Sequence, residues 1–108
     1  MRLLYNFDMD TPAELLAELA RNTRQRRLEK GLSRETLSAM SGVPVPTIAK
    51  FEQQHTISLA SFVAIAKALG HTQEIKALLS QPQYSTMEEL DTINRNQDRK
   101  RGHRENRN

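Results

Sequence analysis

The stretch from Gly31 to Glu52, GLSRETLSAMSGVPVPTIAKFE, constrains the fold of this chain more than any other part of its sequence. Its apolar residues recur at helical spacing on both sides of Gly42, which predicts two short helices, near 34–41 and 45–53, joined by a tight turn. Ser33 is a good N-cap for the first helix, because its side-chain oxygen can accept from the free N–H groups at a helix start. Gly42 can adopt the positive φ that such a sharp turn needs.

Capping signals predict further helices on both sides of this motif. Thr11-Pro12-Ala13-Glu14 is a capping box with proline at the first helical position, so a helix should run from there to about Lys30 and end at Gly31. Ser58 and Thr72 are candidate N-caps of two later helices. The apolar positions of these three helices are Leu15, Leu16, Leu19, Leu59, Phe62, Val63, Ala66, Leu69, Ile75, Leu78 and Leu79. The expected fold is therefore all-α, with a five-helix domain over residues 11–80.

Three segments lie outside the expected domain. Residues 1–10 are an N-terminal arm with apolar side chains from Leu3 to Phe7. Residues 81–96 are a C-terminal extension, in which Thr86 can cap a short helix from Met87 to about Asn94. Residues 97–108 contain no apolar side chain and predict a disordered basic tail. The apolar parts of the arm and the extension either pack on their own domain or form a dimer contact, alone or with the last core helix.

Composition narrows the classes of function. With 108 residues there is room for one domain with a small core, and the absence of cysteine rules out disulfides and thiolate metal sites. The chain has no apolar run long enough to span a membrane, and its N-terminus lacks the features of a signal peptide, so we expect a cytoplasmic protein. His55, His71 and His103 are isolated, and nucleophile and phosphate-loop motifs are missing. We therefore expect no metal, no cofactor and no enzymatic activity.

Positive charge is concentrated in two blocks of the chain, although the net charge is only +3. Residues 21–50 carry seven basic and two acidic side chains, a net of +5, and residues 95–108 carry six and two, a net of +4. Such blocks offer contacts to phosphate, or they are merely solvated helix faces. The first block coincides with the two-helix motif, and this coincidence favours DNA as the partner.

The two helices and their turn follow the helix-turn-helix pattern, in which the second helix enters the DNA major groove. An ordinary helical hairpin in a small all-α protein is the alternative. The chain from Leu19 to Gly70 resembles the Cro/phage-repressor class of helix-turn-helix domains, which is XRE-like. This resemblance rests on RQRRLEKGLS, GVPVPTIAKFE and SLASFVAIAKALG, in that order and at the usual spacing. TIAKFEQ and ISLASFVAIAKALG are more similar to HipB-type antitoxins than to phage repressors.

The resemblance implies which side chains meet the bases of DNA. The base-facing positions would be Pro44, Val45, Pro46, Ala49 and Lys50. The first three are apolar, so they cannot form bidentate hydrogen bonds to purines, but they can contact thymine methyl groups. Direct readout then falls largely on Lys50, whose ammonium could reach guanine. The alternative is that Lys50 binds phosphate.

The resemblance also implies phosphate contacts and one internal ion pair. The phosphate-contacting positions would be Arg24, Ser33, Arg34, Thr47, Gln53 and Gln54. Arg27 and Glu52 match a pair that the class commonly uses as an internal salt bridge. Such a pair can also orient the arginine toward phosphate.

Together these features predict a sequence-specific DNA-binding transcriptional repressor that acts as a homodimer on an inverted-repeat operator in double-stranded DNA. The similarity to HipB-type proteins implies an autoregulatory antitoxin that associates with a HipA-like kinase toxin or an accessory protein. A stand-alone or phage-type regulator is the alternative within the class. A protein-binding adaptor that retains the fold is the alternative outside it, and the apolar start of the second helix keeps that alternative open.

Overall fold

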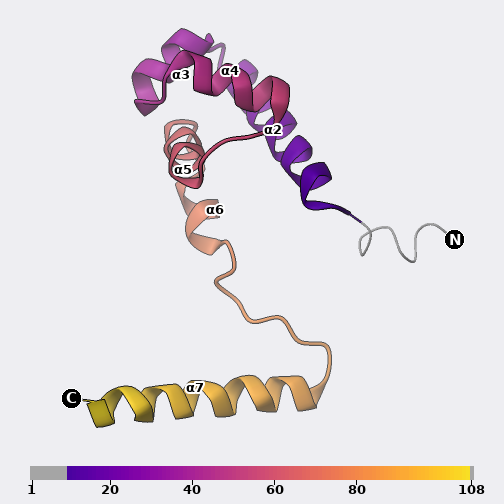
Figure 1. The fold of residues 1–108 in the computed structure, drawn as a ribbon, viewed down its shortest axis with the longest axis vertical. Coiled ribbons are helices and arrows are strands. Elements are labelled where there is room, and N and C mark those ends of the chain that lie inside the picture. Colours follow the sequence, from indigo (N-terminus) through magenta and orange to yellow (C-terminus); the bar gives the residue numbers. More distant parts are fainter. Residues whose placement is uncertain (1–9, 108) are drawn as a thin grey trace, which may run out of the picture. The chain divides into compact units, whose positions relative to one another are not determined.

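Six helices and no strand occur in residues 10–107, the part of the chain that the computed structural model describes (Figure 1). Side chains are described up to residue 99. The expected all-α class is thereby confirmed. Contacts divide the chain into a first unit, up to Ile75, and a second unit, from Lys76. Residues 1–9, with the apolar arm from Leu3 to Phe7, lie outside the described residues.

Helix α2, Pro12–Glu29, begins where the sequence predicts. The Thr11 hydroxyl accepts from the Glu14 N–H at 3.1 Å, and the Glu14 carboxylate accepts from the Thr11 N–H at 2.9 Å. These two bonds satisfy donors that a helix start leaves without partners. The helix closes at Lys30, whose N–H bonds to the Arg27 carbonyl at 3.2 Å, and the Gly31 N–H bonds to the Leu28 carbonyl at 2.9 Å.

Helices α3, Arg34–Ser41, and α4, Val45–Gln54, form the predicted pair. The Ser33 side chain caps α3 by accepting from the Thr36 N–H at 3.0 Å. Gly42 ends α3 with φ +78°, and its N–H bonds to the Ser38 carbonyl at 2.8 Å. This left-handed residue turns the chain sharply enough for α4 to begin three residues later.

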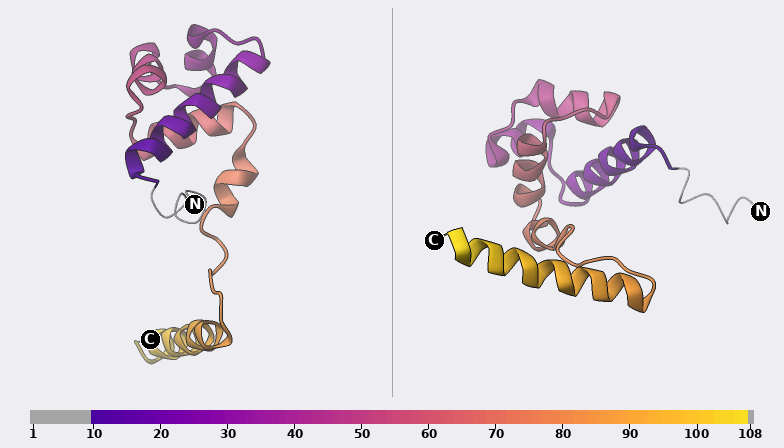
Figure 2. Two further views of the ribbon diagram at one scale, coloured as in Figure 1. Left: turned by 90° about the vertical axis from the view of Figure 1, so that its right-hand side faces the viewer. Right: turned by 60° about the horizontal axis from the view of Figure 1, so that its bottom comes forward.

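The core of the first unit lies where α3, α4 and α5, Leu59–Ala68, come together (Figures 1 and 2). Helix α4 contacts both α2 and α3, and α5 contacts α3. The core cluster consists of Leu37, Val43, Ile48, Ile65 and Leu69. Phe51, also buried, packs edge-to-face on Phe62 with ring centroids 5.9 Å apart, a favoured geometry for aromatic pairs.

Several apolar side chains expected in the core are instead exposed. Leu59 and Val63 lie at the edge of the apolar face of α5. The neighbouring helices cover only part of this face, so these two side chains stay exposed. Leu15, Leu16 and Leu19 of α2 are exposed, whereas the buried residues of this helix are Ala20 and Arg27. The helical spacing of these residues is as predicted, but spacing alone does not show which part of an apolar face the neighbouring helices cover.

Helix α6, Thr72–Ala77, differs from its prediction. Thr72 is its first residue rather than its cap, and none of its residues is buried. The Ser80 N–H bonds to the Ala77 carbonyl at 3.0 Å, so the helix ends before the expected core residues Leu78 and Leu79. Leu79 has φ +59° and is 96% exposed. These two leucines therefore do not form part of the core.

Helix α7, Met87–Arg107, extends well beyond the predicted end at Asn94 and through most of the segment expected to be disordered. The Thr86 hydroxyl caps it as predicted, accepting from the Glu89 N–H at 3.1 Å. Residues 95–107 contain no proline and many good helix formers, and the first turn of the helix carries Glu88 and Glu89, as the helix dipole favours. The lack of apolar residues limits packing, but it does not prevent a helix from forming.

Candidate DNA-binding surface

One face of α4 points away from the core, and it carries most of the expected base-facing side chains. Ile48 and Phe51 are buried on the inner face. The opposite face, which we call the outer face of α4, consists of Pro46, Ala49, Lys50 and Gln53, spaced at i, i+3, i+4 and i+7. Lys50, Pro46 and Gln53 are exposed and Ala49 is half-buried. Lys50 is the only basic residue of α4.

The first turn of α4 is poor in hydrogen-bond donors. Pro44, the exposed N-cap residue, forms no side-chain cap, and neither it nor Pro46 has an N–H. The Thr47 N–H bonds to the Pro44 carbonyl at 3.0 Å, and the Ile48 N–H shares that carbonyl at 3.1 Å. Val45 is half-buried. Its N–H is the one donor of this turn that has no partner among the described hydrogen bonds. Ordinary helix starts offer several such groups to an anion.

A buried ion pair fixes α4 to α2. The Arg27 guanidinium donates to both oxygens of Glu52, through Nε to Oε2 at 2.8 Å and through Nη2 to Oε1 at 3.0 Å. Its Nη1 donates to the Leu32 carbonyl at 2.8 Å, in the loop before α3. The two side chains are only 7% and 2% exposed. These are the two residues that the family resemblance assigns to an internal pair, and their geometry is bidentate.

Two further arginines approach the same carboxylate. Arg34 donates from Nε to Glu52 Oε1 at 3.0 Å, and its Nη2 lies 3.0 Å from that oxygen. Arg24 Nε lies 4.0 Å from it. The side chains of Arg34 and Arg24 are 32% and 54% exposed. One carboxylate thus faces three guanidiniums, so this edge of the domain carries an excess of positive charge beside α4.

The arginines determine the protonation state of Glu52. Burial alone would raise the pKa of this carboxyl. Hydrogen bonds from Arg27 and Arg34, together with their positive charges, outweigh burial and lower the pKa of Glu52 below its ordinary value. Glu52 is therefore ionised at neutral pH and holds the arginines in place.

The remaining expected phosphate contacts are divided between engaged and exposed side chains. The Ser33 hydroxyl caps α3 and also donates to the Thr36 hydroxyl at 3.0 Å. Thr47 is half-buried on α4, and Gln53 and Gln54 are exposed in its last turn. The bond between Arg34 and Glu52 could not be predicted from the sequence, because 18 residues separate the two and no local pattern connects them.

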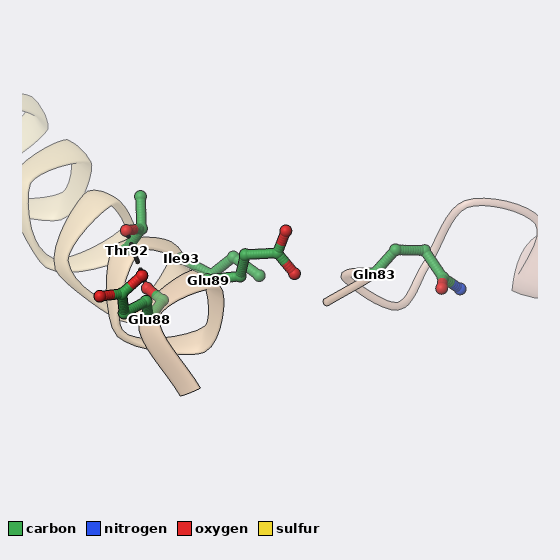
Figure 3. Close-up of a pocket in the computed structure, with 5 residues that line it drawn as sticks. All are labelled: Gln83, Glu88, Glu89, Thr92 and Ile93. Atoms are coloured by element: carbon green, nitrogen blue, oxygen red, sulfur yellow. Dashed lines mark hydrogen bonds between the residues drawn. The ribbon is translucent and has the colours of Figure 1, made fainter. Parts of the chain in front are cut away.

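Outside this surface, the described residues offer little that suggests chemistry. A pocket in the second unit is lined by Gln83, Glu88, Glu89, Thr92 and Ile93 (Figure 3). The Thr92 hydroxyl donates there to the Glu88 carbonyl at 3.0 Å, a bond within α7. In the part of the chain that the structure describes, no cluster of His, Asp and Glu could hold a metal ion. Helices long and apolar enough to cross a membrane are likewise missing from that part.

Comparison with known proteins agrees with this geometry. Residues 24–75 match the model of a helix-turn-helix family, and the match begins within α2 and ends within α6. Neither the curated proteins nor the solved structures that were compared gave a match. The family match supports DNA binding and transcription regulation as the class of function. The family match and the all-helical architecture of residues 10–107 are together consistent with a Cro/repressor-type helix-turn-helix fold.

Proposed function

We propose that this chain is a sequence-specific transcriptional repressor that inserts the outer face of α4 into the major groove of DNA. The observation that carries the proposal is the position of this face. Within a helix-turn-helix domain, Pro46, Lys50 and Gln53 are exposed on the side of the second helix opposite its buried residues. Side chains in the N-terminal part of the second helix, here Pro46 and Lys50, are the ones that reach base edges in such domains.

Phosphate contacts position the domain on the duplex. Arg24 is the best candidate, because it is half exposed and Glu52 is already engaged by two closer guanidiniums. Arg34 reaches phosphate less freely, since it is bonded to Glu52. Gln53 and Gln54 offer amide donors at the end of α4. Contacts of this kind set orientation and register but do not read sequence.

The protein binds its operator as a homodimer. The outer face of α4 has a single basic side chain, so one domain can read only a few base pairs. Two-fold pairing doubles the contacts and requires half-sites about 34 Å apart, one turn of DNA. Leu78, Leu79 and Met87 are exposed apolar side chains that support a dimer contact near α6 and the start of α7. Sedimentation as a monomer at tens of micromolar, with tight DNA binding retained, would refute the dimer.

The DNA-binding proposal is tested by selecting duplexes from a random library with the full chain and measuring affinity at several salt concentrations. Arg24→Ala should weaken binding to selected and random duplexes alike and lower the salt slope by about one. Lys50→Ala should reduce discrimination by about 1–3 kcal/mol if Lys50 reads guanine. Lys67→Ala, at an exposed lysine of α5, is the matched control. If no duplex is enriched, the adaptor alternative replaces this proposal.

We further propose that the repressor is the antitoxin of a HipBA-like toxin–antitoxin pair and represses its own promoter. The support is the similarity of the segments TIAKFEQ and ISLASFVAIAKALG to HipB-type proteins. A neighbouring gene for a HipA-like kinase, whose product co-purifies with this chain, is the expected result. A promoter with no such neighbour would instead indicate a stand-alone or phage-type regulator.

A further inference from the structure

The start of α4 presents hydrocarbon where the recognition helices of DNA-binding proteins usually present polar groups. Pro44 and Pro46 are exposed and without N–H, and Val45 lies half-buried between them. The Thr47 N–H is already bonded to the Pro44 carbonyl. We call residues Pro44, Val45 and Pro46 the apolar tip. Among the described bonds, only the Val45 N–H remains available in this turn.

The chemistry of the tip limits what it can recognise. Purine edges in the major groove are read through N7, O6 and N6, which require donors or acceptors, and phosphate also requires donors. The side chains of the apolar tip offer neither donors nor acceptors. The hydrocarbon group that base pairs present in the major groove is the C5 methyl of thymine, and the same group occurs on 5-methylcytosine. Contact with it needs only an apolar surface of matching shape.

We propose that the apolar tip reads the C5-methyl group of a pyrimidine in the major groove, while Lys50 makes the polar contact further along the same helix. This inference rests on the proposed function, because it requires DNA at the outer face of α4. Pro46 and Lys50 are four residues apart and therefore lie one above the other on that face. The operator half-site should then contain a pyrimidine with a C5-methyl group, thymine or 5-methylcytosine. This pyrimidine should lie one or two base pairs from the base pair that Lys50 contacts.

The test uses the full chain and a duplex selected from a random library. Each thymine is replaced singly by deoxyuridine, which removes only the C5 methyl group. One thymine in each half-site should lose about fourfold in affinity on replacement, the value of one buried methyl group, and the other thymines should lose nothing measurable. In a second set of duplexes, that T·A pair becomes C·G with or without a 5-methyl group on cytosine. The methylated duplex should bind more tightly than the unmethylated one.

Variants assign the effect to the apolar tip. Pro46→Gln should bind the thymine and uracil duplexes equally, because its amide replaces the hydrocarbon surface. Val45→Thr, which keeps the shape of the side chain, should reduce the ratio between the two duplexes and serves if Pro46→Gln does not fold. Pro82→Gln makes the same change at an exposed proline in the second unit and should keep the full ratio.

Three outcomes are distinguishable. If the selected duplex binds tightly but no deoxyuridine substitution weakens it, methyl reading is refuted and the DNA-binding function stands. A ratio that persists in both Pro46→Gln and Val45→Thr would also overturn the assignment to the tip. If the library yields no enriched duplex, the proposed function itself fails, and the experiment shows this before any base is modified.

Discussion

The two units of the chain begin their helices in the same way but differ in what those helices bury. The Ser33 hydroxyl caps α3 and the Thr86 hydroxyl caps α7, with nearly equal distances of 3.0 and 3.1 Å to the N–H three residues on. Yet Leu37 of α3 is fully buried, whereas Met87 of α7 is 70% exposed. Local signals therefore determine where a helix begins, and only apolar surface shared between helices makes a folded core.

Charge is organised differently in the two units as well. In the first unit, Glu52 gathers Arg24, Arg27 and Arg34 from two different helices. In the second unit, acidic residues stand in the first turn of α7 and basic residues follow along the helix. The first arrangement depends on tertiary structure and the second only on the helix dipole. Substitutions should therefore have large effects in the first unit and small ones in the second.

The largest effect is expected for Glu52→Ala. It leaves the buried Arg27 guanidinium without its carboxylate, and breaking a buried pair in this way costs about 3–5 kcal/mol. Glu35→Ala, at an exposed acid in the first turn of α3, should cost less than about 1 kcal/mol. Urea denaturation followed by circular dichroism measures both. Equal costs for the two variants would show that the pair is not structural.

A core substitution compares the units directly. Leu37→Ala should reduce the free energy of unfolding by about 2–5 kcal/mol, because the side chain is fully buried. Leu90→Ala on α7 removes the same atoms from a half-buried position outside any buried cluster, so the unfolding transition of the first unit should not move. A comparable loss for Leu90→Ala would mean that α7 packs on a core, and the contrast between the units would fail.

The free energy of unfolding of the first unit should depend on pH, because Glu52 titrates at a different pH in the folded and unfolded states. The pKa of this group is lowered in the folded protein, so the unfolded chain binds its proton more readily. The stabilisation is complete above the unfolded pKa of about 4.5 and is lost as pH falls through the lower folded value. The stability difference between wild type and Glu52→Gln should be constant from about pH 6 to 8 and shrink below about pH 4.5. A difference that grows in acid would contradict this sign.

The smallest predicted effect concerns two left-handed residues. His55 ends α4 with φ +64°, and Leu79 follows α6 with φ +59°. His55→Gly should relieve backbone strain in the first unit and raise its stability by less than about 1 kcal/mol, since the greater freedom of unfolded glycine offsets part of the gain. Leu79→Gly should leave the thermal unfolding midpoint unchanged. A change in the thermal unfolding midpoint for Leu79→Gly but not for His55→Gly would contradict the expected difference between the two units.

Much of the first unit could be predicted because its determinants are local. Thr11, Ser33 and Ser58 cap the helices that the sequence assigns to them, and Gly42 makes the expected turn. Positions on the outer face of α4 follow from helical spacing and the family resemblance. The caps and spacings depend on residues only three or four positions apart, which a single sequence displays.

The rest depends on contacts that the sequence does not display. The bond between Arg34 and Glu52 joins residues 18 positions apart, and it changes Arg34 from a free phosphate ligand into a tethered one. The exposure of Leu78 and Leu79 follows from the end of α6 at Ala77, which no proline or glycine marks. The full length of α7 does not follow from the sequence, because residues 97–108 lack the apolar residues by which an amphipathic helix is predicted. Tertiary contacts decide the first of these features, and weak local preferences decide the other two.

Amide chemical shifts of the full chain, recorded by NMR during titration with a selected duplex, test the central claim most directly. The outer face of α4 should enter the groove, so the amides of Ala49, Lys50 and Gln53 should show large shift changes, together with Arg24. The amides in the first two turns of α7, from Met87 to Ile93, should remain unchanged. Saturable binding that leaves the amides of α4 unperturbed would contradict the account, because DNA would then be recognised elsewhere on the molecule.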